Sequence, residues 1–240
     1  MAEPINIRPC ESIAEFDQIT DLEQRIWQTD ARDATPGHIA LIATKTGGQV
    51  LGAFAGDEMI GFSLAFVAQR AGQTYLHSHE VGVVEAWQNA GVGFQLKLAQ
   101  RQDALARGFT LMEWTFDPLA VRNAWFNVMK LGAVMRRFIP NLYGVTTSAL
   151  HGGLPTDRLV AEWHLNAPRV QAACEGKPPA LSADAVSIAV PLNLPAEPTA
   201  LALQAHIRRE FEERFAAGYV VTGLEKSESA TAYLLQQGAP

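Results

Sequence analysis

Apolar residues recur along the N-terminal part of this chain at spacings of three and four, the period of an α-helix with one buried face. The first run predicts a helix that ends near Trp27, and Ser12 with Glu15 supplies a capping box at its start. The pair Thr35-Pro36 predicts the N-cap and first position of a second helix. Helices are also expected at two later places, each followed by a glycine: 91–107 and 122–131.

Other stretches are apolar throughout or alternate with period two, which is the pattern of β-strands. Two of them flank Gly56-Asp57, a turn dipeptide that predicts a hairpin. The strand-like segments are 5–8, 49–55, 59–69, 75–84, 109–116, 142–149 and 159–165. Strands outnumber helices and a hairpin lies in the middle. The pattern therefore predicts an α/β chain with a mixed sheet, of the α+β kind, rather than a doubly wound parallel sheet.

The composition changes after the last of these strands. Residues 166–185 are rich in Pro and Ala, which predicts a linker or an irregular connection. Beyond it we expect a strand over 186–194, an amphipathic helix, and two short strands over 219–236. The sequence thus predicts a domain of residues 1–165 and a C-terminal αβ extension of residues 166–240. The extension is too small to hold a core of its own, so it packs on the first domain or on a second subunit of a homodimer.

Composition narrows the class of protein. The 240 residues are 48% hydrophobic and 18% charged, as in globular proteins, and the net charge of −6 disfavours nucleic acid as a partner. Cys10 and Cys174 lie far apart and form no metal-binding or redox pattern, so we expect no metal and two reduced thiols in a cytoplasmic protein. No apolar run is long enough to span a membrane, and the N-terminus lacks the features of a signal peptide.

The stretch QNAGVG, Gln88–Gly93, lies where a strand-like run gives way to a helix-like run. A helix N-terminus presents unpaired N–H groups and the positive end of the helix dipole, so it suits a phosphate. Gly91 and Gly93 leave room for that phosphate to approach the backbone. A Walker loop is excluded because no Gly-Lys-Ser/Thr follows. A dinucleotide fingerprint would have a third glycine and would follow the first strand rather than the fourth.

The same hexapeptide matches the Gln/Arg-x-x-Gly-x-Gly/Ala signature of a coenzyme A pyrophosphate loop, and through it the chain resembles the GNAT acyltransferases. The segments VGVVEAWQNAGVG and NAWFNVMKLGA resemble the family's fourth-strand and later helical motifs, and the element order of residues 1–165 resembles its fold. The resemblance implies acetyl-CoA or another acyl-CoA as co-substrate. The cofactor-binding residues that it implies are Val83, Val84, Gln88, Asn89, Ala90, Gly91, Val92, Gly93, Asn123 and Asn127.

Within that family, segments such as WTFDPL and AEWHL resemble a little-characterised bacterial subfamily of predicted acetyltransferases. One member is linked to succinyl-CoA-dependent N-acylation of amino acids. The resemblance therefore implies a small-molecule amine as acceptor, with amino acids among the candidates. It leaves acetyl and succinyl open as the transferred group.

Acyl transfer from a thioester to an amine needs a base for the amine and donors for the oxyanion. His77 and His79 alternate with Ser78, so we expect both on one face of their strand and Glu80 on the other. Relative to the glycine loop, they stand where serotonin N-acetyltransferase has its paired histidines. Histidine titrates near neutral pH, which makes His79 and His77 the candidate bases. The alternative is a histidine that is hydrogen-bonded within the sheet.

The chain departs from the family pattern at the position of the general acid. Many GNAT enzymes place a tyrosine four residues before the glycine that ends the later helix, and Val128 stands there in this chain. Tyr143, in NLYG, is the candidate substitute, and a tyrosine with its hydroxyl in water is the alternative. A thiolate is also a good enough leaving group to need no acid. Asn123 and Asn127 are one helical turn apart, so we expect them to share a face, with capping or backbone bonding as the alternative.

Two further residues are candidates for substrate binding. Arginine can hold a carboxylate with two parallel hydrogen bonds, so Arg158 is the candidate for a carboxylate on the succinyl group or on an amino acid acceptor. Arg136 and Arg137 are reserves, and a local ion pair between Arg158 and the preceding aspartate is the alternative. Trp114 is a candidate for lining the acceptor pocket, with a place in the core as its alternative.

These observations predict an N-acyltransferase that works by direct attack of an amine on a bound thioester. Neither cysteine lies in the cofactor segments, which disfavours a covalent enzyme intermediate. One alternative is a module of the same fold that binds acyl-CoA without turnover. Another is a nucleotide-binding oxidoreductase, against which the place of the glycine loop in the chain argues.

Overall fold

The computed structural model describes residues 4–144, 154–194, 196 and 198–238. These residues form two compact units, and the boundary between them falls inside the strand β5 (Leu111–Phe116), after residue 112. The predicted division at residue 165 rests on a family resemblance rather than on compactness, and it stays a prediction.

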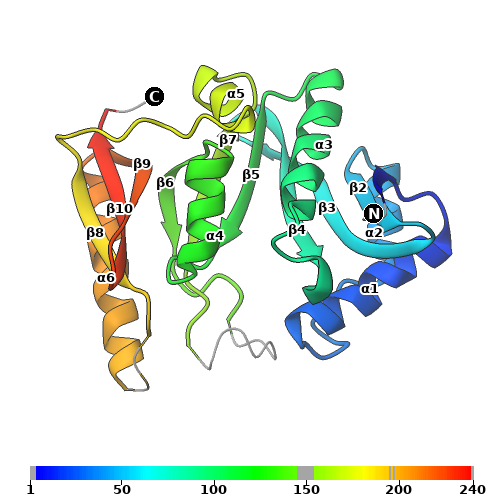
Figure 1. The fold of residues 1–240 in the computed structure, drawn as a ribbon, viewed down its shortest axis with the longest axis horizontal. Helices are drawn as coiled ribbons and strands as arrows, with labels where there is room; N and C mark the ends of the chain where they lie inside the picture. The colour runs from blue at the N-terminus through cyan, green and yellow to red at the C-terminus, as the bar shows by residue number, and fades with distance from the viewer. Residues whose placement is uncertain (1–3, 145–153, 195, 197, 239–240) are drawn as a thin grey trace. The chain divides into compact units, whose positions relative to one another are not determined.

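The first unit is an antiparallel sheet with strand order β1-β2-β3-β4, flanked by helices (Figure 1). Its strands are β1 (Ile5–Pro9), β2 (Gln49–Ala55), β3 (Glu58–Arg70) and β4 (Gln73–Val83). Its helices are α1 (Ile13–Trp27), α2 (Gly37–Lys45), the short 3-10 helix η1 (Glu85–Trp87) and α3 (Val92–Ala106). Every residue of β2 is buried, because helices cover both faces of the sheet.

The second unit is a sheet with strand order β5-β7-β6-β9-β10-β8. Its other strands are β6 (Val134–Ile139), β7 (Arg158–His164), β8 (Val186–Pro191), β9 (Tyr219–Lys226) and β10 (Ala230–Gln237). Its helices are α4 (Val121–Trp125), the π-helix η2 (Phe126–Lys130), α5 (Pro168–Cys174) and α6 (Thr199–Ala216). Figure 1 shows α6 alongside the strands that end the chain, and β9 pairs with β6. The C-terminal segment thus extends the sheet of the residues that precede it.

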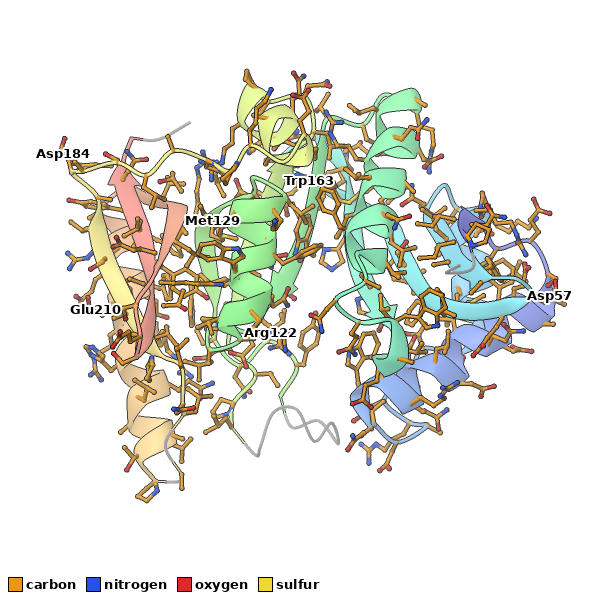
Figure 2. All side chains as sticks on the ribbon, viewed as in Figure 1. Asp57, Arg122, Met129, Trp163, Asp184 and Glu210 are labelled. Carbon is orange, nitrogen blue, oxygen red and sulfur yellow. The ribbon has the colours of Figure 1, made fainter. Side chains whose placement is uncertain are left out.

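Aromatic side chains fill the core of the second unit. Phe211 of α6 stacks on Phe138 of β6 at a centroid distance of 5.8 Å and meets the ring of Tyr233 edge-on at 5.1 Å. Trp163, the largest fully buried side chain, donates from Nε1 to the Leu131 carbonyl at 2.6 Å. Figure 2 labels it on β7. These contacts join α6 and the end of η2 to the strands.

Several local predictions are confirmed. Ser12 and Glu15 form the capping box of α1. The Glu15 N–H donates to Ser12 Oγ, and the Ser12 N–H donates to the Glu15 carboxylate. Strands β2 and β3 form the predicted hairpin around Gly56-Asp57, and Gly56 has the positive φ of a tight turn. The mixed α/β class is confirmed as well. In the described part of the chain, no helix is long and apolar enough to cross a membrane.

Three predictions of elements are wrong. The strand expected over 142–149 does not begin at 142, because residues 142 and 143 belong to a turn and 144 has no regular structure, and 145–149 lie outside the described residues. The strand is instead β6, which the sequence pattern missed because Arg136 and Arg137 interrupt its apolar run. Glu162 of the paired strand β7 meets both arginines. The predicted linker contains α5, and Thr35 does not cap α2, whose N-cap is Pro36.

Candidate functional site

The loop between β4 and α3 has a backbone conformation that its sequence imposes. Asn89 has φ 63° and Gly91 has φ 83°, both in the left-handed region, where asparagine and glycine are the most tolerated residues. Gly91 is the N-cap of α3, and no side chain caps the helix there. The chain therefore turns sharply into α3 and leaves the start of the helix open.

The two glycines of the loop serve different purposes. Gly91 is required by its own backbone, because a side chain at φ 83° is strained. Gly93 has an ordinary backbone, and a Cβ there would meet Val83 Cγ2 at 3.8 Å, which is normal van der Waals contact. Nothing in the fold therefore requires glycine at position 93. A ligand that lies close to the backbone would require it.

The first turn of α3 suits an anion. The first backbone bond of the helix runs from the Gln95 N–H to the Gly91 carbonyl at 3.0 Å, so the N–H groups of residues 92–94 have no partner within the helix. The first turn has no acidic residue. Unpaired donors, the positive end of the helix dipole and a missing Cβ together fit the pyrophosphate of coenzyme A.

The end of β4 distinguishes the two valines that were expected to meet the thioester arm. The Val84 N–H donates to the Ile60 carbonyl at 3.0 Å, so this donor is already used within the sheet. Because ladder bonds alternate along an antiparallel pair, the amide of Val83 points away from β3. Gln88 Nε2 donates to the Val83 carbonyl at 3.2 Å and ties the loop to the end of the strand.

A β-bulge at His79 changes which face of β4 each side chain occupies. Leu64 of β3 pairs with Glu80 and the next residue, Ala65, pairs with Ser78, so His79 has no opposite residue. Ser78, before the bulge, points toward α3, where it contacts Lys97. After the bulge, even-numbered positions face the other way: a Cβ on Gly82 would lie 2.9 Å from Ile26 Cδ1 of α1.

The bulge corrects the prediction that Glu80 lies on the face opposite the histidines. Glu80 Oε1 lies 3.2 Å from His79 Nε2. The His79 ring is flanked by Phe66, at a centroid distance of 5.6 Å, and by His77, at 6.2 Å. The side chain of His79 is 31% exposed, so water can reach it. The two candidate bases are therefore neighbours, and His79 has a carboxylate partner that simple alternation does not predict.

Glu80 in turn contacts a second carboxyl group, that of Glu23 on α1. Thr35 connects them: its N–H donates to Glu23 Oε2 at 2.6 Å and its hydroxyl donates to Glu80 Oε1 at 3.3 Å. Burial and the neighbouring Glu80 raise the pKa of Glu23. Burial alone would raise the pKa of Glu80 too, but hydrogen bonds from His79 and Glu23 hold it below its usual value. The sequence pattern did not single out Glu23, because it is one of several polar residues along a helix with a capping box.

The opposite face of β4 carries a buried amine. Lys97 of α3 is 3% exposed and donates from Nζ to Ser78 Oγ at 2.8 Å, and Ser78 donates to Gln100 Oε1 at 3.2 Å. Burial lowers the pKa of Lys97 well below its usual value, because the charged amine loses its hydration. The sequence does not indicate this group, since a lysine on an amphipathic helix is ordinarily solvated.

The candidates for the acid and for substrate binding lie in the second unit. Tyr143 is 44% exposed, and its hydroxyl lies 3.1 Å from Thr115 Oγ1 of β5. The guanidinium of Arg158 lies over the Tyr143 ring at 5.3 Å. Arg158 is 8% exposed and Asp117 is the largest of its favourable charge interactions. Arg158 and Tyr143 are thus brought together at the start of β7.

The alternative for Arg158 was a local ion pair with Asp157, and Asp157 is one of the charges that favour the ionised Arg158. Asp157 also has other partners. Its carboxylate accepts two bonds from Arg208 of α6, at 2.9 and 2.7 Å, and a third from the Asn141 N–H at 3.0 Å. The reserve arginines are also engaged. Arg136 and Arg137 hold Glu162 at 2.8 and 3.2 Å.

Asn123 and Asn127 do not share an environment, contrary to the prediction. Asn123 is exposed, whereas Asn127 is 1% exposed and accepts a bond from Trp114 Nε1 at 3.2 Å. The helix changes from α to π geometry at Phe126, which alters the direction of the residues that follow. Trp114 is buried against Trp163, with the rings edge-on at 5.8 Å, so its packing matches the core alternative.

The predicted site residues therefore fall into two groups. The histidines, the two valines and the loop of residues 88–93 belong to β4 and the segment that follows it in the first unit. Tyr143, Arg158, Trp114 and the two asparagines belong to the second unit.

No protein-family model matches this chain, and no curated protein matches it in sequence. Solved structures do match it. A GNAT-family protein from Desulfovibrio desulfuricans superposes with a TM-score of 0.54 at 12% identity, over 68% of this chain and 99% of its own. The yncA protein of Salmonella typhimurium, with acetyl-CoA as its cofactor, superposes with a TM-score of 0.52 at 16% identity, over 68% and 97%.

A third match is the ribosomal-protein-S18-alanine N-acetyltransferase of Escherichia coli, with a TM-score of 0.51 at 16% identity, over 68% of this chain and 96% of that one. The three matches agree on the class of protein whose fold this chain has, the GNAT acetyltransferases. At such low identities, the likeness concerns the fold alone. About one third of this chain lies outside the shared fold.

Proposed function

We propose that this protein is an acyl-CoA-dependent N-acyltransferase of the GNAT type. One observation carries the proposal: in a GNAT-like fold, the loop after β4 ends in an uncapped helix whose second glycine, Gly93, the fold itself does not require. A pyrophosphate bound to the N–H groups of residues 92–94 accounts for both the missing cap and the glycine. Residues 88–93 are then the cofactor loop, with acetyl-CoA or another acyl-CoA as co-substrate.

In this proposal the backbone of β4 and the histidines act on the reacting groups. The Val83 N–H, which points away from β3, donates to the thioester oxygen as negative charge develops there. His79 removes a proton from the acceptor ammonium, with His77 as its neighbour. The amine then forms the C–N bond as the C–S bond breaks, and the thiolate leaves.

The proposal also gives roles to residues of the second unit. Tyr143 would return a proton to the thiolate, and its hydroxyl is already held near Thr115 on β5. Arg158, which lies next to Tyr143, would bind a carboxylate on the acyl group or on the acceptor. Asn123, being exposed, remains a candidate for contact with the pantetheine arm, and the burial of Asn127 and Trp114 favours structural roles for both.

The acceptor in this proposal is an amine, a small molecule or an amino acid, and the acyl group is acetyl or succinyl. One similar fold belongs to an enzyme that acts on a protein N-terminal alanine, so a peptide amine belongs in the test as well. The second candidate function is a module that binds acyl-CoA without turnover. It is favoured by Val128, a fully buried residue where many GNAT enzymes have the acid tyrosine.

The binding test compares two glycines of α3 that have the same φ of +83° and lie at its opposite ends, Gly91 and Gly108. We expect Gly91→Asp to weaken acetyl-CoA binding at least 100-fold by calorimetry, because the new carboxylate caps the N–H groups and repels the phosphates. Gly108→Asp places the same strain on a backbone outside the proposed phosphate site. Its affinity for acetyl-CoA should therefore stay within about threefold of the wild-type value. Equal affinities of the two variants would refute the loop assignment.

Turnover separates the enzyme from the binding module. Release of free thiol from acetyl-CoA and succinyl-CoA should be measured over a panel of amines, amino acids and alanine-initiated peptides. We expect one class of acceptor to raise thiol release above hydrolysis, and His79→Ala to lower kcat by about 100-fold or more while acetyl-CoA still binds. Binding without acceptor-dependent release would favour the module.

A further inference from the structure

Two carboxyl groups from distant parts of the chain meet beside the candidate base. Glu23 comes from the middle of α1 and is 1% exposed, and Glu80 comes from β4 with a side chain that is 16% exposed. Thr35 bonds to both of them, so the two side chains lie close together. Two buried carboxylates held this close repel one another, because little solvent screens their charges. At least one of them must therefore carry a proton.

The remaining oxygens point to the same conclusion. Glu23 Oε2 accepts from the Thr35 N–H, and Glu80 Oε1 accepts from the Thr35 hydroxyl and contacts His79 Nε2. The other oxygen of each group, Glu23 Oε1 and Glu80 Oε2, is buried without a hydrogen-bond partner when both groups are treated as acceptors. One proton between these two oxygens satisfies both. Buried polar atoms are otherwise rarely left without a partner.

We propose that Glu23 is a neutral carboxylic acid that donates its proton to Glu80, and that this acid pair holds His79 as the tautomer with hydrogen on Nε2. This extends the proposed function, because it concerns the residue proposed there as the base. Glu23 and Glu80 are positioning residues in this scheme, since neither touches the substrates.

The surroundings decide which of the two carries the proton. Glu23 is the more buried of the two, and burial penalises the ionised form. Glu80 receives a hydroxyl and an imidazole N–H, which stabilise a carboxylate. Thr35 fixes the geometry of both, and its own carbonyl is anchored by the Thr20 hydroxyl at 2.7 Å.

The consequence for His79 follows from Glu80 being an acceptor. An imidazole nitrogen that faces a carboxylate carries the hydrogen, which leaves the other nitrogen as the basic atom. His79 Nε2 faces Glu80, so Nδ1 is the atom that can receive a proton. The ring is also held between Phe66 and His77. The acid pair therefore sets both the orientation and the tautomer of the base.

Infrared spectroscopy tests the proton on Glu23 without any substrate. We expect the full-length wild type at neutral pH to show the carbonyl stretch of a protonated carboxylic acid, and Glu23→Gln to lose it. Glu58→Gln, at an exposed position of β3, is the matched control and should keep the band. If Glu23→Gln and Glu58→Gln have the same spectrum in this region, Glu23 is ionised and the proposal is wrong.

Long-range ¹H–¹⁵N NMR of the histidine rings tests the tautomer. We expect neutral His79 to be in the Nε2–H form in the wild type and in Glu23→Gln, because an amide donates to Glu80 as the acid does. Glu23→Leu is similar in size but cannot donate, so it should release Glu80 and give a mixture of tautomers. A mixture already present in the wild type, or an unchanged tautomer in Glu23→Leu, would overturn the positioning role.

Kinetics then connect the acid pair to the proposed reaction. Glu23→Leu should lower kcat about tenfold or more with the acetyl-CoA KM unchanged within about twofold, and Glu23→Gln should keep most of the activity. An equal kcat in Glu23→Leu and the wild type would overturn the role in catalysis. If the wild type transfers no acyl group at all, the proposed function fails, while the infrared and NMR results still decide the acid pair.

Discussion

The buried carboxylates of the second unit and the buried ionisable groups around β4 in the first unit have different partners. In the second unit, buried Asp157 is held by Arg208, and Glu162 is held by Arg136 and Arg137. In the first unit, buried Glu23 meets another carboxyl group, and buried Lys97 meets a serine hydroxyl.

The difference distinguishes buried groups that stabilise the fold from buried groups that can take part in proton transfer. A buried group that faces an opposite charge stays ionised, and its contribution is to hold elements together. A buried group without one changes its protonation state, and groups with shifted pKa values are the ones that proton transfer uses. Glu23, which lies beside another carboxyl group near β4, is of the second kind, which agrees with the place of the candidate base on that strand.

The largest expected effect comes from breaking a charge pair of the second unit. Arg208→Ala leaves the carboxylate of Asp157, whose side chain is fully buried, without its two strongest bonds. We expect a loss of about 3–5 kcal/mol in the free energy of unfolding, measured by urea denaturation. Arg209→Ala, at the exposed neighbouring position, is the control and should change stability by less than about 0.5 kcal/mol. Similar losses in both variants would show that Arg208 contributes no more than a surface arginine.

A gain in stability is expected where the first unit buries an amine. Lys97→Met replaces the amine with an apolar group of similar length, and Ser78 keeps its bond to Gln100. We expect the free energy of unfolding at pH 7 to rise by about 1–3 kcal/mol, measured by urea denaturation. Lys45→Met, at an exposed position at the end of α2, should have almost no effect.

The pH dependence of that gain has a definite sign. Burial lowers the pKa of Lys97 well below 10.5, so at a pH between the lowered value and 10.5 the unfolded chain binds a proton that the folded protein does not. The stability of the wild type therefore rises as the pH increases toward 10.5, and the advantage of Lys97→Met should shrink over that range. An advantage that stays constant between pH 7 and 10 would mean that Lys97 is charged in the folded protein.

The smallest effect is expected at Glu162 of the second unit, because two arginines share this one carboxylate. Arg136→Ala removes one arginine from Glu162 but leaves Arg137 in place at 3.2 Å. The side chain of Arg136 is 31% exposed, so solvent weakens the pair, and we expect a loss of about 0.5–1 kcal/mol. A loss as large as that of Arg208→Ala would contradict the redundancy.

Acid unfolding sharpens the same prediction. Burial alone would raise the pKa of Glu162, but the nearby His164 and the two arginines lower it to about 2. Its contribution to stability is therefore present above about pH 4.5 and is lost as the pH falls toward 2. In Arg136→Ala this loss should be smaller and should occur at higher pH, as a pH series of unfolding curves would show.

The sequence predicted the elements that are encoded within a few residues. The capping box of Ser12 and Glu15, the hairpin at Gly56-Asp57 and the entry to α3 at Gly91 depend on local hydrogen bonds and on φ angles that particular residues favour. The order of these elements was enough to indicate the fold that the solved structures share. Strand β6 was missed because the partner of Arg136 and Arg137, Glu162, lies in another strand.

The candidate site divides in the same way. The loop of residues 88–93 and the two histidines were visible as a pattern, because both depend on spacing along the chain. The bulge at His79 was not visible, since it arises from the pairing of β4 with β3, and it reversed the predicted face of Glu80. Glu23 was not visible either, because only the folded chain brings α1 to that strand.

By itself, then, the sequence determined where several helices begin and where the chain turns, and it predicted where a phosphate would approach the backbone. Only the tertiary structure decided which buried groups keep their charge. Asp157 meets its arginine 51 residues later, and Glu80 meets Thr35 across 45 residues. The reason is that conformation is set by neighbours in the chain, whereas the protonation state of a buried group is set by neighbours in space.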